Sequence, residues 1–120
     1  MKTILIIEDN ESNMYLISFI LEKHGYEVLK AYSGKEGLKM ALEKKPDLIV
    51  MDWQLPDLNG IELTKELRKD EYFKNLPIVF CTSNVMKGDR EKAFEAGASG
   101  YIEKPIIPEI FIQEINKYLQ

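Results

Sequence analysis

The sequence predicts an α/β fold in which five helices cover a doubly wound, five-stranded parallel sheet. Short apolar runs alternate along the chain with longer segments whose apolar residues recur at helical spacing. Three of the short runs are apolar at successive positions, which is typical of parallel strands buried on both faces. Right-handed crossovers leave few strand orders, and 2-1-3-4-5 is a common order for a sheet of this size.

Five apolar runs are the predicted strands. They are Thr3 to Ile7, Val28 to Ala31, Leu48 to Met51, Ile78 to Cys81, and Tyr101-Ile102. The first, third and fourth runs are continuously apolar, as expected of the inner strands. The second run is weaker and takes an edge position in the predicted order.

Five amphipathic segments separate or follow the strands. Their apolar residues span Met14 to Leu21, Leu38 to Leu42, Ile61 to Leu67, Ala93 to Ala96, and Phe111 to Leu119. Gly25, Pro46 and Gly97 follow three of these segments, and Gly and Pro commonly end helices. Pro108 suits the first turn of the last helix. Pro56 and Gly60 are interpreted as turn residues that open the third helix.

Composition limits the classes of function. A chain of 120 residues suits one domain, so residues 1–120 are expected to form a single unit. The net charge is −4 without a basic block, which argues against a nucleic-acid partner. No apolar stretch is long enough to span a membrane, and no signal-peptide cleavage pattern is present. The single cysteine, Cys81, suits a reducing cytoplasm and a buried, inert thiol.

Polar residues follow four of the five predicted strands. These are Glu8-Asp9, Asp52, Thr82-Ser83 and Glu103-Lys104. Open parallel sheets bind ligands outside the carboxyl ends of their strands, where the strand order reverses. Adjacent strands lie about 4.8 Å apart, so Asp9 and Asp52 can approach a common point. We therefore expect one site that combines three acids, a hydroxyl group and an ammonium group.

Three neighbouring carboxylates need a cation or a proton. At about 5 Å and an effective dielectric constant near 20, each pair repels by roughly 3 kcal/mol. Mg²⁺ prefers oxygen ligands and retains several waters, so it suits two carboxylates with a backbone carbonyl. A zinc site is not expected, because the only histidine, His24, lies at the far end of its helix.

Each of these residues also has a purely structural interpretation. Asn10 and Ser12 are expected to cap the first helix, and Ser83 could equally cap the fourth. Asp52 could be a solvated strand end, and Lys104 a solvated turn residue. Together these alternatives would require four coincidences at one edge of the sheet, so a functional site is the better interpretation.

Several sequence stretches resemble the receiver domain of two-component response regulators, from the first strand to the last helix. They are Ile4-Leu5-Ile6-Ile7-Glu8-Asp9-Asn10, Pro46-Asp47-Leu48-Ile49-Val50-Met51-Asp52, Leu55-Pro56 with Gly60, Thr82-Ser83, and Gly97-Ala98 followed by Tyr101-Ile102-Glu103-Lys104-Pro105. The resemblance implies a flavodoxin-like, CheY-like fold. Glu8-Asp9-Asn10, Gln54-Leu55-Pro56 and Met86-Lys87-Gly88-Asp89 are similar to single-domain regulators of the DivK type and to receiver modules of hybrid kinases.

The resemblance also implies residue roles and partners. Asp52 would accept a phosphoryl group from a histidine kinase or a histidine phosphotransfer protein. Asp9, Asp52 and the Gln54 backbone carbonyl would bind Mg²⁺, or Mn²⁺ in its place, and Glu8 would act through a water. Lys104 would pair with Asp52 and then with the phosphoryl group. The Thr82 hydroxyl would bind another phosphoryl oxygen, and Tyr101 would change rotamer with the switch.

Two departures and several flanking residues matter for these roles. Glu8 stands where many relatives have Asp, and Leu55 replaces a frequent Met; neither argues against phosphorylation. Gln54 and Asn84 are expected to flank the site, and Trp53 to be a partly exposed loop residue. A cis bond between Lys104 and Pro105 would aim the lysine inward, but most X-Pro bonds are trans, so the sequence disfavours it.

The output surface would be the face formed by the fourth helix, the fifth strand and the fifth helix. Some of Ile106, Ile107 and Ile110 are expected to form a contact with a downstream protein there, or with a second copy in a phosphorylation-dependent dimer. The chain would otherwise be a monomer.

Alternative functions remain open at this point. A receiver module cut from a hybrid histidine kinase is one. A phosphohydrolase with an aspartyl nucleophile is disfavoured, because Gln54 stands where such enzymes carry a second acid. A flavin-binding module is disfavoured because Glu8-Asp9 would repel phosphate. A receiver-like module used only for protein contact would not need the acids and Lys104.

Overall fold

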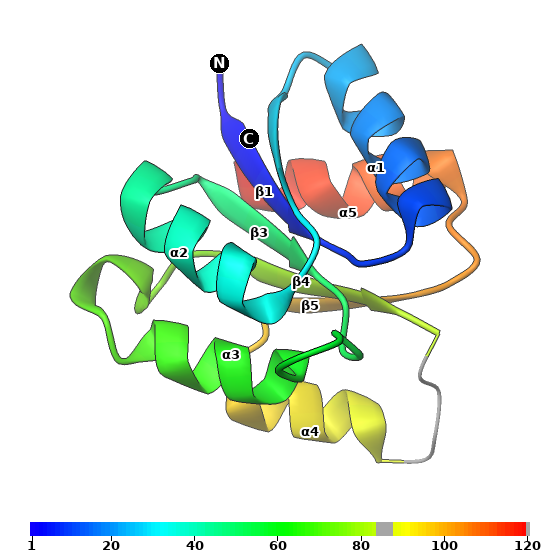
Figure 1. Ribbon diagram of the computed structural model, residues 1–120. Coiled ribbons are helices and arrows are strands. Elements are labelled where there is room, and N and C mark those ends of the chain that lie inside the picture. Colours follow the sequence, from blue (N-terminus) through cyan, green and yellow to red (C-terminus); the bar gives the residue numbers. More distant parts are fainter. Residues whose placement is uncertain (84–87, 120) are drawn as a thin grey trace.

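The sheet has the predicted strand order. The computed structural model describes residues 1–83 and 88–119. All strand pairs are parallel, in the order β2-β1-β3-β4-β5 (Figure 1). The strands are β1 (Thr3–Ile7), β2 (Glu27–Ala31), β3 (Leu48–Met51), β4 (Ile78–Thr82) and β5 (Gly100–Glu103).

Helices cover both faces of this sheet. They are α1 (Glu11–Lys23), α2 (Gly34–Lys44), α3 (Gly60–Arg68), α4 (Asp89–Ala96) and α5 (Pro108–Leu119). Figure 1 shows α1 and α5 on one face, with α2, α3 and α4 on the other. The two layers of helices explain why the inner strands are apolar at successive positions.

The two faces of the sheet form two separate cores. Successive side chains of a strand point to opposite faces, so Ile4 and Ile6 of β1 pack with α1 and α5. Leu5 and Ile7 of the same strand pack with the helices of the other face. All four side chains are fully buried, which fixes β1 at the centre of the molecule.

The helix ends follow capping chemistry, with two corrections to the sequence predictions. Asn10 caps α1, as predicted, and its side chain accepts a hydrogen bond from the Asn13 backbone N–H. The prediction that Ser12 is a cap was wrong, because Ser12 lies inside the helix. The cap of α4 is Gly88, with φ +90°, so the alternative in which Ser83 caps α4 is also wrong.

Three further features complete the fold. A 3₁₀ turn at Glu71–Phe73, between α3 and β4 in the sequence, was not predicted, and its Phe73 is buried. The Lys104–Pro105 peptide bond is cis, the isomer that the sequence disfavoured. Among the described residues, no helix combines the length and apolar character needed to cross a bilayer.

Candidate functional site

The candidate site lies where β1, β3, β4 and β5 reach their carboxyl ends. Ile7 pairs with Met51 in the sheet register, so Glu8 and Asp52 leave two neighbouring strands at the same level. The Asp52 backbone N–H donates to the Ile7 carbonyl at 3.1 Å and fixes this alignment. The predicted convergence of strand ends is therefore present in the fold.

Glu8, Asp9 and Asp52 form an acidic cluster. Each offers a carboxylate oxygen within 4.8 Å of those of the other two. Glu8 and Asp52 are buried, with 2% and 8% of their surfaces exposed, whereas Asp9 is exposed to solvent. A solvent-borne ion can therefore reach the cluster from the side of Asp9.

Lys104 joins two of these acids. Its Nζ lies 2.7 Å from Glu8 Oε1 and 3.0 Å from Asp52 Oδ2. The Lys104 backbone N–H donates to the Thr82 carbonyl at 3.0 Å, which anchors the lysine to the end of β4. The family resemblance implied the pairing of Lys104 with Asp52, whereas its pairing with Glu8 was not predicted. Because the Lys104 side chain is only 12% exposed, water screens these ion pairs weakly.

Burial and charge shift the pKa values of this pair. Desolvation raises the pKa of Glu8 despite the hydrogen bond from Lys104 and that from the Asn10 backbone N–H. For Lys104, desolvation alone would lower the pKa, but the hydrogen bond to Glu8 and the charge of Asp52 together raise it. A salt bridge normally lowers the pKa of its acid, so the raised value of Glu8 shows how strongly burial opposes its charge.

The donor set fits a hard divalent cation. All three acids supply oxygen, and His24, the only histidine of the chain, lies at the C-terminal end of α1. Asp52 uses Oδ2 for Lys104, and Asp9 makes no hydrogen bond to another described residue. These two acids can therefore turn oxygens towards a cation, which is the pattern that Mg²⁺ favours.

The remaining predicted residues surround this cluster. The Gln54 backbone N–H donates to Asp52 Oδ1 at 3.3 Å, and its side chain is exposed. Thr82 and Tyr101 are buried, with 1% and 8% of their surfaces exposed. Trp53 is half-buried, as predicted, and its ring meets Phe80 edge-on with centroids 5.9 Å apart.

Asn84, expected to flank the site, lies outside the described residues, as do Met86 and Lys87. Cys81 is 1% exposed, and desolvation raises the pKa of its thiol to about 12. The predicted burial of this thiol is confirmed.

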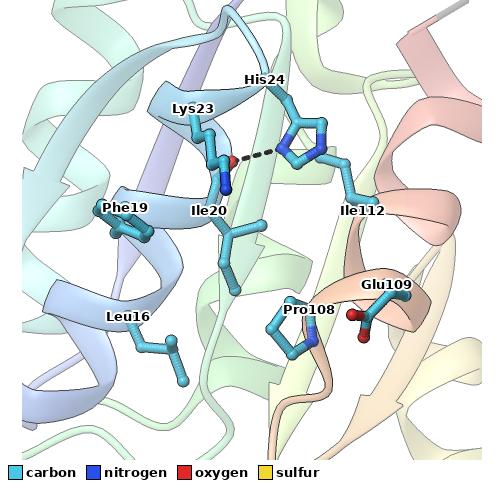
Figure 2. Close-up of a pocket in the computed structure, with 8 residues that line it drawn as sticks. All are labelled: Leu16, Phe19, Ile20, Lys23, His24, Pro108, Glu109 and Ile112. Carbon is cyan, nitrogen blue, oxygen red and sulfur yellow. Dashed lines mark hydrogen bonds between the residues drawn. The ribbon is translucent and has the colours of Figure 1, made fainter.

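An apolar groove lies elsewhere on the molecule, between α1 and α5. Its volume is about 460 Å³, and its lining is mainly apolar, from Leu16, Phe19 and Ile20 to Pro108 and Ile112 (Figure 2). His24 closes one end, and its Nδ1 lies 2.8 Å from the Ile20 carbonyl (Figure 2). No acid of the cluster lines this groove, so the groove is separate from the candidate site.

One polar contact near the site had no signal in the local sequence pattern. Asp57, in the loop after Asp52, accepts hydrogen bonds from the backbone N–H groups of Gly34 and Lys35. Because its partners lie more than 20 residues away, only the folded arrangement brings them together.

Comparison with known proteins agrees with this geometry. The family model of the response regulator receiver domain matches residues 4–116. The polar-differentiation response regulator DivK of Brucella ovis is 45% identical over 118 residues, covering 98% of this chain and 96% of the relative.

Two solved structures extend the comparison. The receiver domain of the sensor histidine kinase PA1611 from Pseudomonas aeruginosa, which holds a magnesium ion in its active-site cleft, superimposes with a TM-score of 0.91 at 32% identity. The superposition covers 98% of this chain and 97% of the PA1611 receiver domain. Chemotaxis protein CheY4 of Vibrio cholerae gives a TM-score of 0.93 at 29% identity, with 98% of each chain covered. The chain therefore belongs to the response regulator receiver family, whose domains pass signals from a phosphodonor kinase to downstream targets.

Proposed function

We propose that Asp52 is the phosphoacceptor of a single receiver domain spanning residues 1–120 and acting in the cytoplasm. The observation that carries this proposal is the position of the Asp52 carboxylate. It is buried, lies 3.0 Å from Lys104 Nζ, and shares a cluster with Glu8 and Asp9. A carboxylate so placed has a cationic neighbour and an acidic set suited to a metal ion, as phosphoryl transfer requires.

Mg²⁺ is the proposed cofactor, and Mn²⁺ would substitute for it. Asp9, Asp52 and the Gln54 backbone carbonyl would hold the ion, and Glu8 would reach it through a water. The ion would neutralise charge on the transferring phosphoryl group. The carboxylate cluster and the magnesium ion in the PA1611 receiver domain support this assignment.

In the proposed transfer, an Asp52 carboxylate oxygen attacks the phosphorus of a phosphohistidine. The new bond joins that oxygen to phosphorus, and the phosphorus–nitrogen bond breaks and leaves its electron pair on the donor imidazole. Lys104 would move from the Asp52 carboxylate to a phosphoryl oxygen. The donor would be a histidine kinase or a histidine phosphotransfer protein.

The domain would catalyse only its own phosphorylation and dephosphorylation. A phosphohydrolase acting on external substrates remains the less favoured alternative, because Gln54 supplies an amide where a second acid would be needed. Failure of the purified protein to hydrolyse p-nitrophenyl phosphate would support this choice, whereas sustained turnover would overturn it.

Thr82 and Tyr101 would transmit the modification. The Thr82 hydroxyl would bind a phosphoryl oxygen, and Tyr101 would change rotamer as the segment after β4 moves. These movements would alter the face formed by α4, β5 and α5. Ile107 and Ile110 on this face are 51% and 56% exposed, whereas Ile106 packs partly against the core.

Ile107 and Ile110 are therefore the proposed contact residues for a downstream protein, or for a second copy in a phosphorylation-dependent dimer. Ile107→Ser should weaken target binding and dimerisation. Leu42→Ser is the matched control, because Leu42 is 44% exposed on α2, away from this face. Light scattering of the beryllofluoride-treated protein measures dimerisation, and a binding assay with an identified target measures the target contact. Equal behaviour of both variants would remove Ile107 from the interface.

The direct test is phosphorylation with acetyl phosphate in the presence of Mg²⁺, followed by intact and peptide mass measurement. We expect one phosphoryl group on Asp52 and none after EDTA treatment. Asp52→Asn should take up no phosphoryl group. Modification of the Asp52→Asn protein to the wild-type extent would overturn the assignment.

A further inference from the structure

The loop between β3 and α3 is fixed at its C-terminal end by close backbone packing. The Gly60 backbone N–H donates to the Trp53 carbonyl at 2.7 Å. A Cβ atom at Gly60 would lie 2.6 Å from the Asp52 carbonyl oxygen, so only glycine allows this approach. Asn59 then caps α3 by accepting from the Glu62 backbone N–H at 2.9 Å. The loop therefore leaves Asp52 and returns to it within eight residues.

The middle of the same loop is attached to a different helix. The Asp57 carboxylate accepts from the Gly34 backbone N–H at 2.7 Å and from the Lys35 N–H at 3.0 Å. These N–H groups belong to the first turn of α2, whose carbonyl partners are missing in any helix. The hydrogen bonds, led by that from Lys35, lower the pKa of Asp57, because they stabilise the charged form of the carboxylate.

Backbone packing reinforces this attachment. A Cβ atom at Gly34 would lie 2.8 Å from Leu58 Cβ and 3.1 Å from the Leu58 carbonyl oxygen. The start of α2 therefore contacts the loop directly. Helix α2 also has a local cap, because the Ser33 side chain accepts from the Glu36 backbone N–H at 3.2 Å. The Asp57 bonds thus add a long-range connection to a helix that already caps itself.

We infer that Asp57 is a positioning residue for the phosphoacceptor site. By tying the β3–α3 loop to α2, it holds the Gln54 backbone, three residues earlier, in place beside Asp52 and the acidic cluster. Fixing one residue's backbone costs about 1–2 kcal/mol of conformational entropy, so a loop ordered in advance binds a cation more tightly. Asp57 itself contacts neither the cation nor the phosphoryl group. This inference rests on the proposed function, since it concerns the same site.

The test compares Asp57→Ala and Asp57→Asn with Ser33→Ala, the matched control that removes the local cap of the same helix. Mg²⁺ affinity is read from Trp53 fluorescence, and stability from urea unfolding followed by circular dichroism. Asp57→Ala should weaken Mg²⁺ binding about tenfold, the lower end of what supporting hydrogen bonds contribute at metal sites. Ser33→Ala should lose stability but keep wild-type Mg²⁺ affinity. Asparagine keeps one acceptor oxygen and replaces the other with an NH2 donor, so Asp57→Asn should keep one of the two hydrogen bonds and show an intermediate Mg²⁺ affinity.

Each other outcome has a defined meaning. Equal Mg²⁺ affinity of Asp57→Ala and Ser33→Ala would overturn the positioning role. Equal weakening by Asp57→Asn and Asp57→Ala would also overturn it, because the hydrogen bond that asparagine keeps would then contribute nothing to the position of the loop. Should Asp57→Ala fail to fold, Asp57→Asn and the hydrogen exchange of the Gly34 and Lys35 amides provide the comparison. Failure of the proposed function is a separate result, since it would appear as wild-type protein that takes no phosphoryl group on Asp52.

Discussion

Replacing Lys104 by methionine tests the electrostatic balance of the site. The substitution keeps the length and the apolar part of the side chain but removes the ammonium group that contacts Glu8 at 2.7 Å and Asp52 at 3.0 Å. Three acids would then share a cluster with oxygens within 4.8 Å and no cationic partner among the residues that the structure describes. We expect the free energy of unfolding to fall markedly in the absence of Mg²⁺.

The magnitude follows from the geometry of the cluster. Two unit charges about 5 Å apart repel by roughly 3 kcal/mol at an effective dielectric constant near 20. Removing one partner of a buried ion pair costs about 3–5 kcal/mol. Because the Lys104 side chain retains some exposure, we expect the lower end, about 3 kcal/mol. With an m-value of about 1–3 kcal/mol per molar urea, the unfolding midpoint should fall by roughly 1–3 M.

The effect should depend on pH. Burial already raises the pKa of Glu8, and loss of the ammonium group would raise it further. A carboxyl group whose folded-state pKa exceeds its unfolded value stabilises the fold only while it is protonated. The stability of Lys104→Met should therefore decrease as pH rises through the raised pKa of Glu8. The difference in unfolding free energy between Lys104→Met and wild type should therefore narrow as pH falls.

Urea unfolding in EDTA, followed by far-ultraviolet circular dichroism at pH 5.5 and pH 8, provides the assay. Lys117→Met is the matched control, because Lys117 also pairs with an acid at 3.0 Å but its side chain is 63% exposed. Exposed pairs contribute about 0–1 kcal/mol. If Lys104→Met lost no more unfolding free energy than Lys117→Met, and lost the same amount at both pH values, the Lys104 ion pairs would not stabilise the fold.

Three other predictions concern single residues around the site. Asp9→Asn removes repulsion within the cluster. Because Asp9 is exposed, water screens this repulsion to roughly 1 kcal/mol, so stability in EDTA should rise by that amount while Mg²⁺ binding weakens; lower stability in EDTA would contradict this. Cys81, with a thiol pKa of about 12 and 1% exposure, should resist Ellman's reagent at pH 8 in the folded protein and react in urea; rapid reaction of the folded protein would show that the thiol is accessible. Gly60→Ala would place a Cβ 2.6 Å from the Asp52 carbonyl oxygen and should cost about 1–3 kcal/mol, measured by urea unfolding; a cost below about 0.5 kcal/mol would mean that the loop relaxes freely.

Much of the fold could be predicted from the sequence, because continuous apolar runs are the direct consequence of strands buried on both faces. Runs at Thr3–Ile7 and Leu48–Met51 coincide with β1 and β3. Strand β4 extends one residue further, to Thr82, because Thr82 pairs with Glu103 in the sheet. A threonine can continue the hydrogen bonding of a strand without continuing its apolar run. The apolar pattern therefore did not predict that β4 ends at Thr82.

The site was predictable to the extent that topology determines it. Parallel strands bring their carboxyl ends together, so the meeting of Asp9, Asp52 and Lys104 followed from the strand order. The second contact of Lys104, with Glu8, did not follow, because the reach of a long side chain depends on rotamers that the strand pattern does not encode. The hydrogen bonds of Asp57 to α2 were hidden for a related reason, since they join segments more than 20 residues apart.

Capping residues and turns were the least predictable parts. Asn10 and Ser12 are both good helix caps, and only the backbone shows that Asn10 occupies the cap position. The 3₁₀ turn at Glu71–Phe73 is three residues long, too short to show a helical period. The position of a helix cap or a short turn depends on the backbone path of the folded chain, which the sequence pattern does not specify.

The most direct test of the central claim is a fluorescence titration of Trp53, the residue after Asp52. Mg²⁺ is added first and beryllofluoride second, to wild type and to Asp52→Asn. We expect a saturable fluorescence change with Mg²⁺ in wild type and a further change with beryllofluoride that Asp52→Asn does not show. A beryllofluoride response of equal size in Asp52→Asn would contradict the assignment of Asp52 as the acceptor.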